Sequence, residues 1–525
     1  MSLISSINIA QQALSVNQSA ITTVSNNIAN VDTPGYSKLR VDQAAVVNWT
    51  ASAGSAISQA EACSGVTVAN VTRYSDWFLQ NYSWQEGTTG AYLTQASSTA
   101  SNVQDLVNEL KTTGLSSALG NFYNAANAVS NAPNDITARQ NYVDAASSVC
   151  SVFNSINGNL DDIKKSLVGS GSPDGTLESS EVSSQIDKVN GLLDQLADVN
   201  FGIIKTNNGD TSSSSLLDQR DALISQLTAL MPASVVQNPN GTVNIAIGDT
   251  DLLKGNTVKG HLSAVETGNA DNPVKISIVD PKNPATIIAS DVTSEINNGS
   301  IGAILDICGS DTTKFTISGV LKSLDTMASG FAGVLNKIQT STNYPSGTNT
   351  PMCMTSDGKN LQVSGPNNYL FVNKSAAGLS ANGITAANIA VNSAVVADPY
   401  KIAVARVDTA EVGNTDEVGN NSNMALVMDA RNDSNYYSTL GGTTLEQYLA
   451  NMTSTVGAKV QDIDGRLTNQ NLVLTTVKNN LQSKMGVNLD EELTDLIKYQ
   501  RAYQSAAKIF NICNSLLEEL VHLGQ

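Results

Sequence analysis

The C-terminal stretch from Val487 to Leu523 carries an uninterrupted helical pattern that constrains the fold of the whole chain. Apolar or small residues alternate three and four positions apart, the spacing of a coiled-coil seam, at Leu496, Tyr499, Tyr503, Ala506, Phe510, Cys513, Leu517 and Leu520. Asp490, Glu491 and Glu492 occupy the expected first turn, where carboxylates suit the positive end of the helix dipole. Such a helix would be roughly 50 Å long. Because its seam must be buried, it needs a partner.

The N-terminus has the same rhythm. Its alternating positions are Leu3, Ile7, Ala10, Leu14, Asn17, Ile21, Val24 and Ile28. We interpret the one polar member, Asn17, as a buried amide of the kind that fixes register and oligomeric state. Two ordinary amphipathic helices of one bundle are the alternative. Matched seams at opposite ends favour a chain that returns to its starting point, with its ends pairing with each other and with neighbouring copies.

The predicted assembly interface therefore lies on both terminal helices. It comprises Leu3, Ile7, Leu14, Asn17, Ile21, Val24 and Ile28, together with Leu489, Leu496, Tyr499, Tyr503, Phe510, Leu517 and Leu520. A single copy would satisfy these seams poorly. We therefore expect both helices to be mobile before assembly and to order on incorporation.

Charge and hydropathy limit the partners of the chain. Its 29 basic and 47 acidic residues give a net charge of −18, and no basic cluster offsets it. This argues against nucleic acid and anionic membranes as partners. No apolar run is long enough for membrane insertion, and no basic region precedes an apolar core as in a cleavable signal peptide. A cytoplasmic protein is the default from these features alone.

The sequence offers little for catalysis, and we expect no enzyme activity, cofactor or metal site. There are only two histidines, His261 in an expected β loop and His522 near the C-terminus. Nucleophile-elbow and phosphate-loop motifs are missing. The cysteines are scattered and odd in number, which favours neither disulfides nor zinc: Cys63, Cys150, Cys308, Cys353 and Cys513. We interpret Arg220, between Asp218 and Asp221, as part of a helix-surface or inter-helix ion pair.

The order of patterns along the chain predicts a mainly α fold with inserted β structure. Helical periodicity covers 91–227, 320–338 and 423–481, and strand signals occur at 235–236, 242–247, 274–279 and 285–288, with a second β-like stretch at 344–413. Asp135 is expected to cap a helix that follows the break at Pro133. Three domains are predicted: a terminal coiled coil (1–40 plus 486–525), a helical stem (41–231, 301–340 and 415–485) and an outer β-rich domain (232–300 plus 341–414).

A sharp turn follows the first helix. Pro34 ends any helix, and Gly35 permits a positive φ angle. The surrounding letters, N-N-I-A-N-V-D-T-P-G-Y-S, include Asn30, Thr33 and Tyr36 and resemble the N-terminal signature of the flagellar axial proteins, the family of rod, hook and hook-associated proteins. The segment from Asn488 to Lys508 resembles the C-terminal signature of the same family.

Three further motifs resemble hook-associated members of this family: A-R-Q at 138–140, L-D-Q-R-D-A-L at 217–223 and G-V-N-L-D-E-E at 486–492. The resemblance implies a structural subunit at the junction between hook and filament, secreted through the flagellar export channel without a cleaved signal. It also implies several partners: further copies, the hook protein, the adjoining hook-associated protein at the filament base and an export chaperone that binds the C-terminal helix. A hook or distal rod protein is the alternative within the family. An exported surface enzyme or adhesin would need a carboxylate-lined cleft in 232–300 or 341–414.

Overall fold

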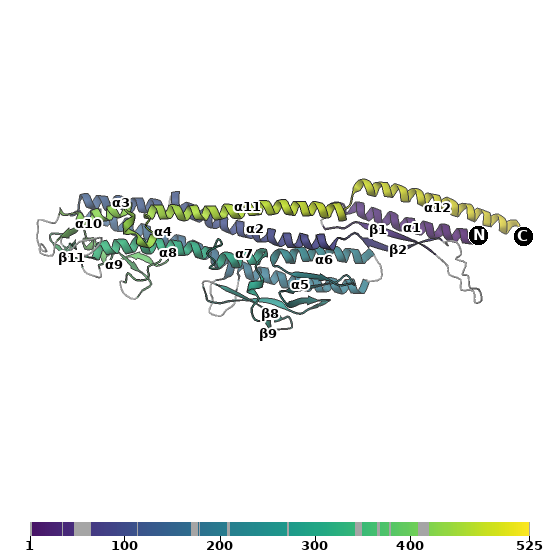
Figure 1. The fold of residues 1–525 in the computed structure, drawn as a ribbon, viewed down its shortest axis with the longest axis horizontal. Helices are drawn as coiled ribbons and strands as arrows, with labels where there is room; N and C mark the ends of the chain where they lie inside the picture. The colour runs from purple at the N-terminus through teal and green to yellow at the C-terminus, as the bar shows by residue number, and fades with distance from the viewer. Residues whose placement is uncertain are drawn as a thin grey trace.

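The chain folds into an elongated, mainly helical molecule whose two ends lie together at one tip (Figure 1). This computed structural model describes residues 3–33, 35–46, 65–112, 114–169, 177, 179–206, 211–269, 272–341, 349–356, 358–364, 368–376, 380–407 and 419–523. The fold class predicted from the sequence is confirmed. Among the described helices, none is long and apolar enough to cross a membrane.

Two long helices form the axis of the stem. Helix α2 (Trp77–Thr112) lies along α11 (Leu445–Met485), which at 1.5 Å per residue is roughly 60 Å long (Figure 1). Helix α2 begins earlier than the predicted start at Ala91, because Asp76 accepts a hydrogen bond from the Leu79 amide at 3.0 Å. Thr444 and Gln447 form a capping box at the start of α11.

Shorter helices pack around this axis. They are α3 (Leu115–Asn131), α4 (Ile136–Val168), α5 (Glu181–Thr206), α6 (Thr211–Leu230), α7 (Gly299–Cys308), α8 (Ile317–Thr340), α9 (Ser393–Ala397) and α10 (Ser422–Asn432). Single 3₁₀ turns lie at η1 (Thr293–Glu295), η2 (Pro399–Lys401), η5 (Ser434–Tyr436) and η6 (Ser438–Leu440). The Asp135 carboxylate accepts from the Thr137 amide at 2.8 Å, so the predicted cap of α4 is confirmed.

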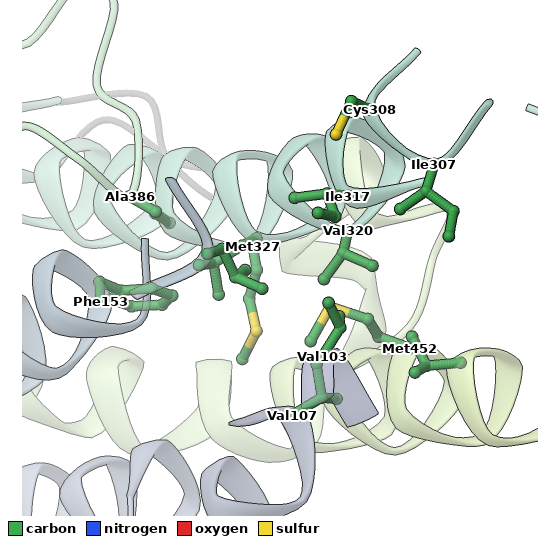
Figure 2. Close-up of a cluster of buried hydrophobic side chains, with 14 of the residues drawn as sticks. Val103, Val107, Phe153, Ile307, Cys308, Ile317, Val320, Met327, Ala386 and Met452 are labelled. Atoms are coloured by element: carbon green, nitrogen blue, oxygen red, sulfur yellow. The ribbon is translucent and has the colours of Figure 1, made fainter. Parts of the chain in front are cut away.

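One continuous apolar core runs through the stem. Figure 2 shows part of it, where Val103 of α2, Phe153 of α4, Ile317 of α8 and Met452 of α11 converge. Toward the end farthest from the termini the core becomes aromatic, and the Phe122 and Phe331 rings lie 5.3 Å apart in an edge-to-face arrangement. These contacts hold the stem helices in fixed positions.

Apart from a hairpin next to the terminal helices, the strands of the described residues form two separate groups, all antiparallel. Beside α5 and α6 lie β3 (Ser234–Gln237), β4 (Val243–Ile247), β5 (Thr250–Lys254), β6 (Thr257–Val258), β7 (His261–Glu266), β8 (Val274–Asp280) and β9 (Asn283–Ala289), in the orders β3-β4-β5-β6 and β7-β8-β9. With α8 and α10 lie β10 (Thr350–Met354), β11 (Leu361–Val363), β12 (Phe371–Asn373), β13 (Ile389–Val391) and β14 (Ala405–Val407). The strands predicted at 235–236, 242–247, 274–279 and 285–288 are confirmed.

These groups do not form the single outer β-rich domain predicted for 232–300 plus 341–414. The first projects from the middle of the molecule, and the second lies at the tip opposite the chain ends (Figure 1). Helix α8, 24 residues long, separates them by roughly 36 Å of helix. The expected loop at His261 is also wrong, because this residue begins strand β7.

The terminal helices α1 (Leu3–Ala29) and α12 (Leu489–Leu523) pack against each other beyond the end of the stem (Figure 1). A hairpin of β1 (Leu39–Ala45) and β2 (Val66–Arg73) also packs on α1, although no strand was predicted in this part of the chain. The hairpin therefore belongs with the terminal pair, whereas the predicted division ended that domain at residue 40. The remainder of the predicted domain division stays a prediction.

Candidate assembly interface

The predicted seam of α12 lies on the side of that helix that packs against α1. Ala506 is 6% exposed, and the half-buried positions are Leu496, Tyr499, Phe510, Cys513 and Leu517. Three predicted residues remain exposed: Leu489 and Leu520 near the ends of the helix, and Tyr503 in its middle. The helix start at Asp490, Glu491 and Glu492 is confirmed, since all three stand in the first turn of α12.

The predicted seam of α1 is only partly covered. Val24 is buried, whereas Leu3, Ile7, Leu14, Asn17, Ile21 and Ile28 are half-buried. The positions that are actually buried are offset from this seam: Ala10, Val16, Ala20, Thr23, Val24 and Asn27. The reason is that α1 packs against the hairpin as well as against α12.

Asn17 does not bridge the helices within one copy. Its Nδ2 atom donates to the carbonyl oxygen of Ala13, in the same helix, at 2.7 Å. The buried amide that joins the two helices is Asn27 instead, which is fully buried. Any role of Asn17 in register between copies stays a prediction, as does the predicted interface as a whole.

Helix α12 also carries a second apolar face. Four residues spaced three or four apart, here called the exposed apolar row, are between 46% and 56% exposed: Ile509, Ile512, Leu516 and Leu520. At the same tip of the pair, where both chain ends lie, Ile4 of α1 is 64% exposed. Large aliphatic side chains repeated along one helix face normally mark a contact surface. One copy of the chain leaves this face without a covering element among the described residues.

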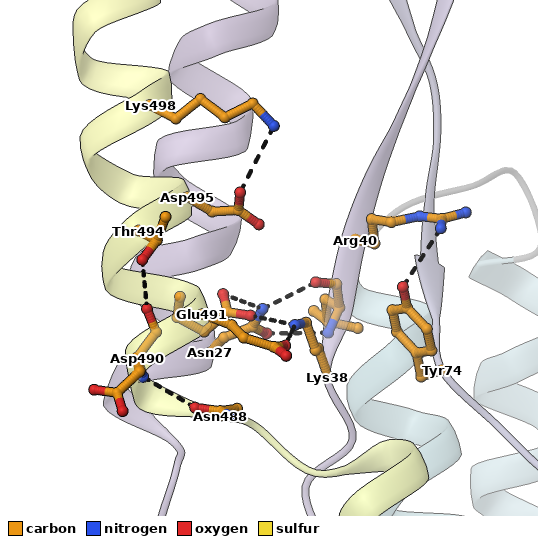
Figure 3. Close-up of polar contacts among 12 residues, drawn as sticks. Asn27, Lys38, Arg40, Tyr74, Asn488, Asp490, Glu491, Thr494, Asp495 and Lys498 are labelled. Atoms are coloured by element: carbon orange, nitrogen blue, oxygen red, sulfur yellow. Dashed lines mark hydrogen bonds and ion pairs between the residues drawn. The ribbon is translucent and has the colours of Figure 1, made fainter.

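A buried polar cluster joins the terminal pair at the base of the hairpin (Figure 3). Asn27 Nδ2 donates to Glu492 Oε2 and to the Leu39 carbonyl, each at 2.9 Å. Its Oδ1 atom accepts from the Tyr36 hydroxyl at 2.9 Å and from the Leu39 amide at 3.0 Å. The Asn27 amide thus uses both ends, and each bond fixes its orientation.

Lys38 completes this cluster. Its ammonium lies 2.9 Å from Glu492 Oε1 and 3.2 Å from Glu491 Oε2. Burial by itself would lower the pKa of Lys38, but hydrogen bonds to Glu492 and Glu491 outweigh it and raise this pKa. The Lys38 amide donates to the carbonyl of Met485, the last residue of α11, at 2.8 Å. Lys38 therefore contacts both helices that meet at Gly486.

The family turn motif leads the chain into this cluster. Asn30 Nδ2 donates to the Asn26 carbonyl at 2.9 Å, and the Thr33 hydroxyl donates to Asn30 Oδ1 at 3.2 Å. Gly35 has φ of 82°, so the predicted positive φ is confirmed. Pro34 lies outside the described residues. The turn brings Tyr36 back against the helix that it has just left, within reach of Asn27.

A second polar cluster fixes the hairpin to the stem. Arg73, the last residue of β2, donates from Nε to Asp218 at 2.7 Å and from Nη2 to Asp221 at 2.8 Å. Arg220 donates to Asp221 at 2.7 Å and also to the Gly241 carbonyl before β4. Burial raises the pKa of the Asp218 carboxyl, while Arg73 opposes this shift. Arg220 is 2% exposed, so the helix-surface alternative was wrong, whereas the predicted ion pair is present, with Asp221 as its partner.

The two clusters contain the functional candidates that sequence patterns did not single out. Asn27, Lys38 and Arg73 belong to no periodic seam and to no catalytic motif. Asn27 and Glu492 are separated by 465 positions, so no local pattern relates them. The available signal was chemical: a carboxylate in the first turn of α12 faces inward, where it requires a donor.

The described residues offer few groups for catalysis or metal binding. No set of three His, Cys, Asp or Glu side chains among them is placed to hold a metal ion. His261 Nε2 lies 3.1 Å from Asp194 of α5, as a partly exposed pair. The side chain of His522 and all of Cys63 lie outside the described residues. Cys150, Cys308, Cys353 and Cys513 are free thiols.

Comparison with known families and proteins identifies this architecture. Residues 100–347 match the helical domain of the flagellar hook-associated protein FlgK. Residues 7–36 match the flagella basal body rod protein family, and residues 473–523 match the C-terminal region of the basal body rod proteins FlgEFG. The last two matches cover the terminal helices, and the first covers much of the stem.

Relatives that match over their whole length point to the same family as these domain matches. The chain is 27% identical to flagellar hook-associated protein 1 of Bacillus subtilis, over 98% of this chain and 97% of that protein. Identity to the protein of the same name from Escherichia coli is 23%, over 98% of this chain and 99% of the relative.

A solved structure shows the same fold. It is that of the flagellar hook junction protein FlgK from Burkholderia pseudomallei, with a TM-score of 0.58 at 13% identity, covering 77% of this chain and all of that one. Hook-associated protein 1, rather than a hook or rod protein, is therefore the member to which the motifs at 138–140, 217–223 and 486–492 pointed. The chain belongs to the flagellar hook-associated protein 1 family, whose members are structural proteins of the bacterial flagellum.

Proposed function

We propose that this chain is a structural subunit of the junction between flagellar hook and filament, and that its terminal helices join it to neighbouring copies. The observation that carries the proposal is the exposed apolar row on α12, which stays open although α1 already covers the other side of that helix. A seam with two apolar sides suits a helix that has one partner in its own chain and another in the next copy.

The energetics support assembly through this surface. Full burial of a Leu or Ile side chain is worth about 1.5–3 kcal/mol relative to exposure, and the four residues of the row, each 46–56% exposed, would gain roughly half of this. Several such side chains per copy, repeated around a closed assembly, can offset the entropy lost when subunits associate. A single pairwise contact of this size would be weak. The surface therefore favours many copies over a dimer.

The proposal includes partners and a route. The subunit contacts the hook protein on one side and the adjoining hook-associated protein at the filament base on the other. Before assembly an export chaperone covers the exposed apolar row of α12. The chain leaves the cell through the flagellar export channel without a cleaved signal peptide. The family relationship and the open face of α12 support these expectations.

Complementation tests the proposal. In a strain lacking this gene, the wild-type gene should restore filaments and swimming, whereas Ile512→Asp with Leu516→Asp should leave hooks without filaments. Gln504→Asp, an exposed change on α12 outside the apolar row, serves as the matched control and should restore both. Circular dichroism of the purified variants checks that the stem is folded. Filaments of normal number on cells with the double variant would reject the assembly role of α12.

A further inference from the structure

The hairpin β1–β2 lies between the terminal helices and the stem, and both buried polar clusters lie at its base. We propose that this base is a bracket that sets the direction of the terminal pair relative to the stem, with Glu492 and Arg73 as its positioning residues. The inference rests on the proposed function, because the direction of the pair matters only if the pair enters an assembly. According to this inference, assembly requires Glu492 and Arg73 as well as the residues of the apolar seams.

The first half of the bracket holds α12. Gly486 separates α11 from α12, so the backbone alone leaves the direction of α12 undetermined. Glu492 is 1% exposed and meets Asn27 of α1 on one oxygen and Lys38 on the other. A carboxylate held by a hydrogen bond from one segment and an ion pair from another restricts the position of its helix. Apolar side chains alone would allow α12 to slide or rotate on α1.

The second half holds the stem. Leu39, which exchanges backbone bonds with the Asn27 side chain, pairs directly with Arg73 across the hairpin. The Arg73 guanidinium then bonds both Asp218 and Asp221 of α6. The path from terminal helix to stem thus consists of hydrogen bonds and one strand pair throughout. Hydrogen bonds are directional. This path can therefore fix the direction of the terminal helices relative to the stem, in addition to holding them close to it.

The two members of the ion pair, Lys38 and Glu492, are unequal in burial, and this gives the inference a sharp test. Removing Lys38 leaves the carboxylate of Glu492 buried without a counter-charge, a costly state. Removing the charge of Glu492 leaves Lys38 at 19% side-chain exposure and still paired with Glu491. Glu492→Gln also keeps an oxygen that accepts from Asn27. We therefore expect Lys38→Met to be severe, Glu492→Gln to be mild, and the double variant to be close to wild type.

The experiment measures direction and assembly in the same set of full-length proteins. Spin labels at Ser505 of α12 and Thr475 of α11, both exposed, report the distance between the two helices, with Cys63 and Cys513 replaced by serine to remove background labelling. Wild type should give one narrow distance distribution. Lys38→Met should broaden it and reduce filaments per cell at least about tenfold, and the double variant should return both readings to within about twofold of wild type.

Two results would overturn the bracket. One is a Lys38→Met protein with an unchanged distance distribution; the other is a double variant no better than Lys38→Met. Arg73→Met provides an independent arm, which should broaden the same distribution through the other half of the bracket. If Lys38 served only the stability of the fold, Lys38→Met would lower the unfolding temperature of the stem, and adding Glu492→Gln would not restore it. If the wild-type gene fails to restore filaments, the proposed function fails, and the distance measurements still decide the bracket.

Discussion

Asn27 Nδ2 and Glu492 Oε2 lie 2.9 Å apart, which joins the first and the last helix of the chain by a hydrogen bond between residues 465 positions apart. The bond is buried, and Asn27 makes three others in the same place. Loss of this side chain would leave the Leu39 amide, the Leu39 carbonyl and one Glu492 oxygen without a partner. Buried groups in that state destabilise a fold strongly.

Asn27→Ala should therefore weaken the terminal pair by about 3 kcal/mol. Hydrogen exchange of α12 amides, measured by mass spectrometry, should quicken accordingly, while amides of α3 and α4 keep their rates. Asn26→Ala removes an exposed neighbour and should change neither set. Equal exchange in the two variants would show that Asn27 contributes nothing beyond its helix position.

The cluster should loosen in strong alkali. Burial, followed by the nearby charges of Asp218 and Glu492, raises the pKa of Tyr36 to about 12. The neutral hydroxyl is the form that donates to Asn27, so its contribution is complete below the ordinary tyrosine pKa of about 10 and is lost as pH rises through about 12. Exchange of α12 should accelerate in this window in wild type. In Tyr36→Phe the same window should show a smaller change.

The terminal pair should exchange faster than the stem in the purified monomer. Helix α12 contacts mainly α1 and exposes its apolar row, whereas α3 and α4 lie in the core around Phe122 and Phe331. Local opening of a helix with few buried contacts costs less. Fast exchange at 3–28 and 489–520 with protection at 115–168 would agree. Uniform protection in a verified monomer would mean that one chain already satisfies both seams.

Arg139 should support the tip opposite the chain ends. Its guanidinium donates to the carbonyl oxygens of Pro133 at 2.8 Å, Ile402 at 3.0 Å and Pro399 at 3.2 Å, and burial lowers the pKa of this arginine to about 10. Arg139→Ala should lower the free energy of unfolding by about 3 kcal/mol. Denaturant titration measures this difference. Asn141→Ala, an exposed change on the same helix, should stay within about 0.5 kcal/mol of wild type.

Thiol labelling should separate the cysteines. Burial raises the pKa of Cys150 and of Cys308 to about 12, so little thiolate forms there at neutral pH. Cys353 is buried as well, whereas Cys513 is only half-buried. Alkylation of the native protein, followed by peptide mass spectrometry, should modify Cys513 well before these three. Rapid modification of Cys308 would contradict the packing of α7 against the core.

Local periodicity accounts for what the sequence predicted well. The seam from Leu496 to Leu517 and the cap at Asp135 depend on residues a few positions apart, and both lie where expected except for Tyr503, which is exposed. The seam of α1 is only partly covered, because the hairpin shares that helix with α12. The hairpin itself was missed, since its strands lie on either side of a long intervening segment and each alternates over only a few residues. Partners so far apart leave no local pattern.

Distance along the chain also explains the other errors. Asn17 was chosen as the key amide because it fell in the seam, but within one copy the turn at Gly35 and the strand at Leu39 place Asn27 between the helices. A role of Asn17 between copies stays a prediction. The strand-rich regions were grouped because they look alike in composition. Only the rigid length of α8 shows that they must lie apart.

Because α1 and α12 pack together at the same tip, the proposed assembly surface can form only in a chain that has been translated to its end. Translation produces α1 first and α12 last, so a ribosome that stops early releases a chain with an unpaired first helix and no Glu492 to meet Asn27. A chain that stops between α11 and α12 still contains every helix of the stem, from α2 to α11. It lacks the surface that we propose neighbouring copies recognise. Under the proposed function, the pairing of the first helix with the last therefore restricts assembly to chains that carry both.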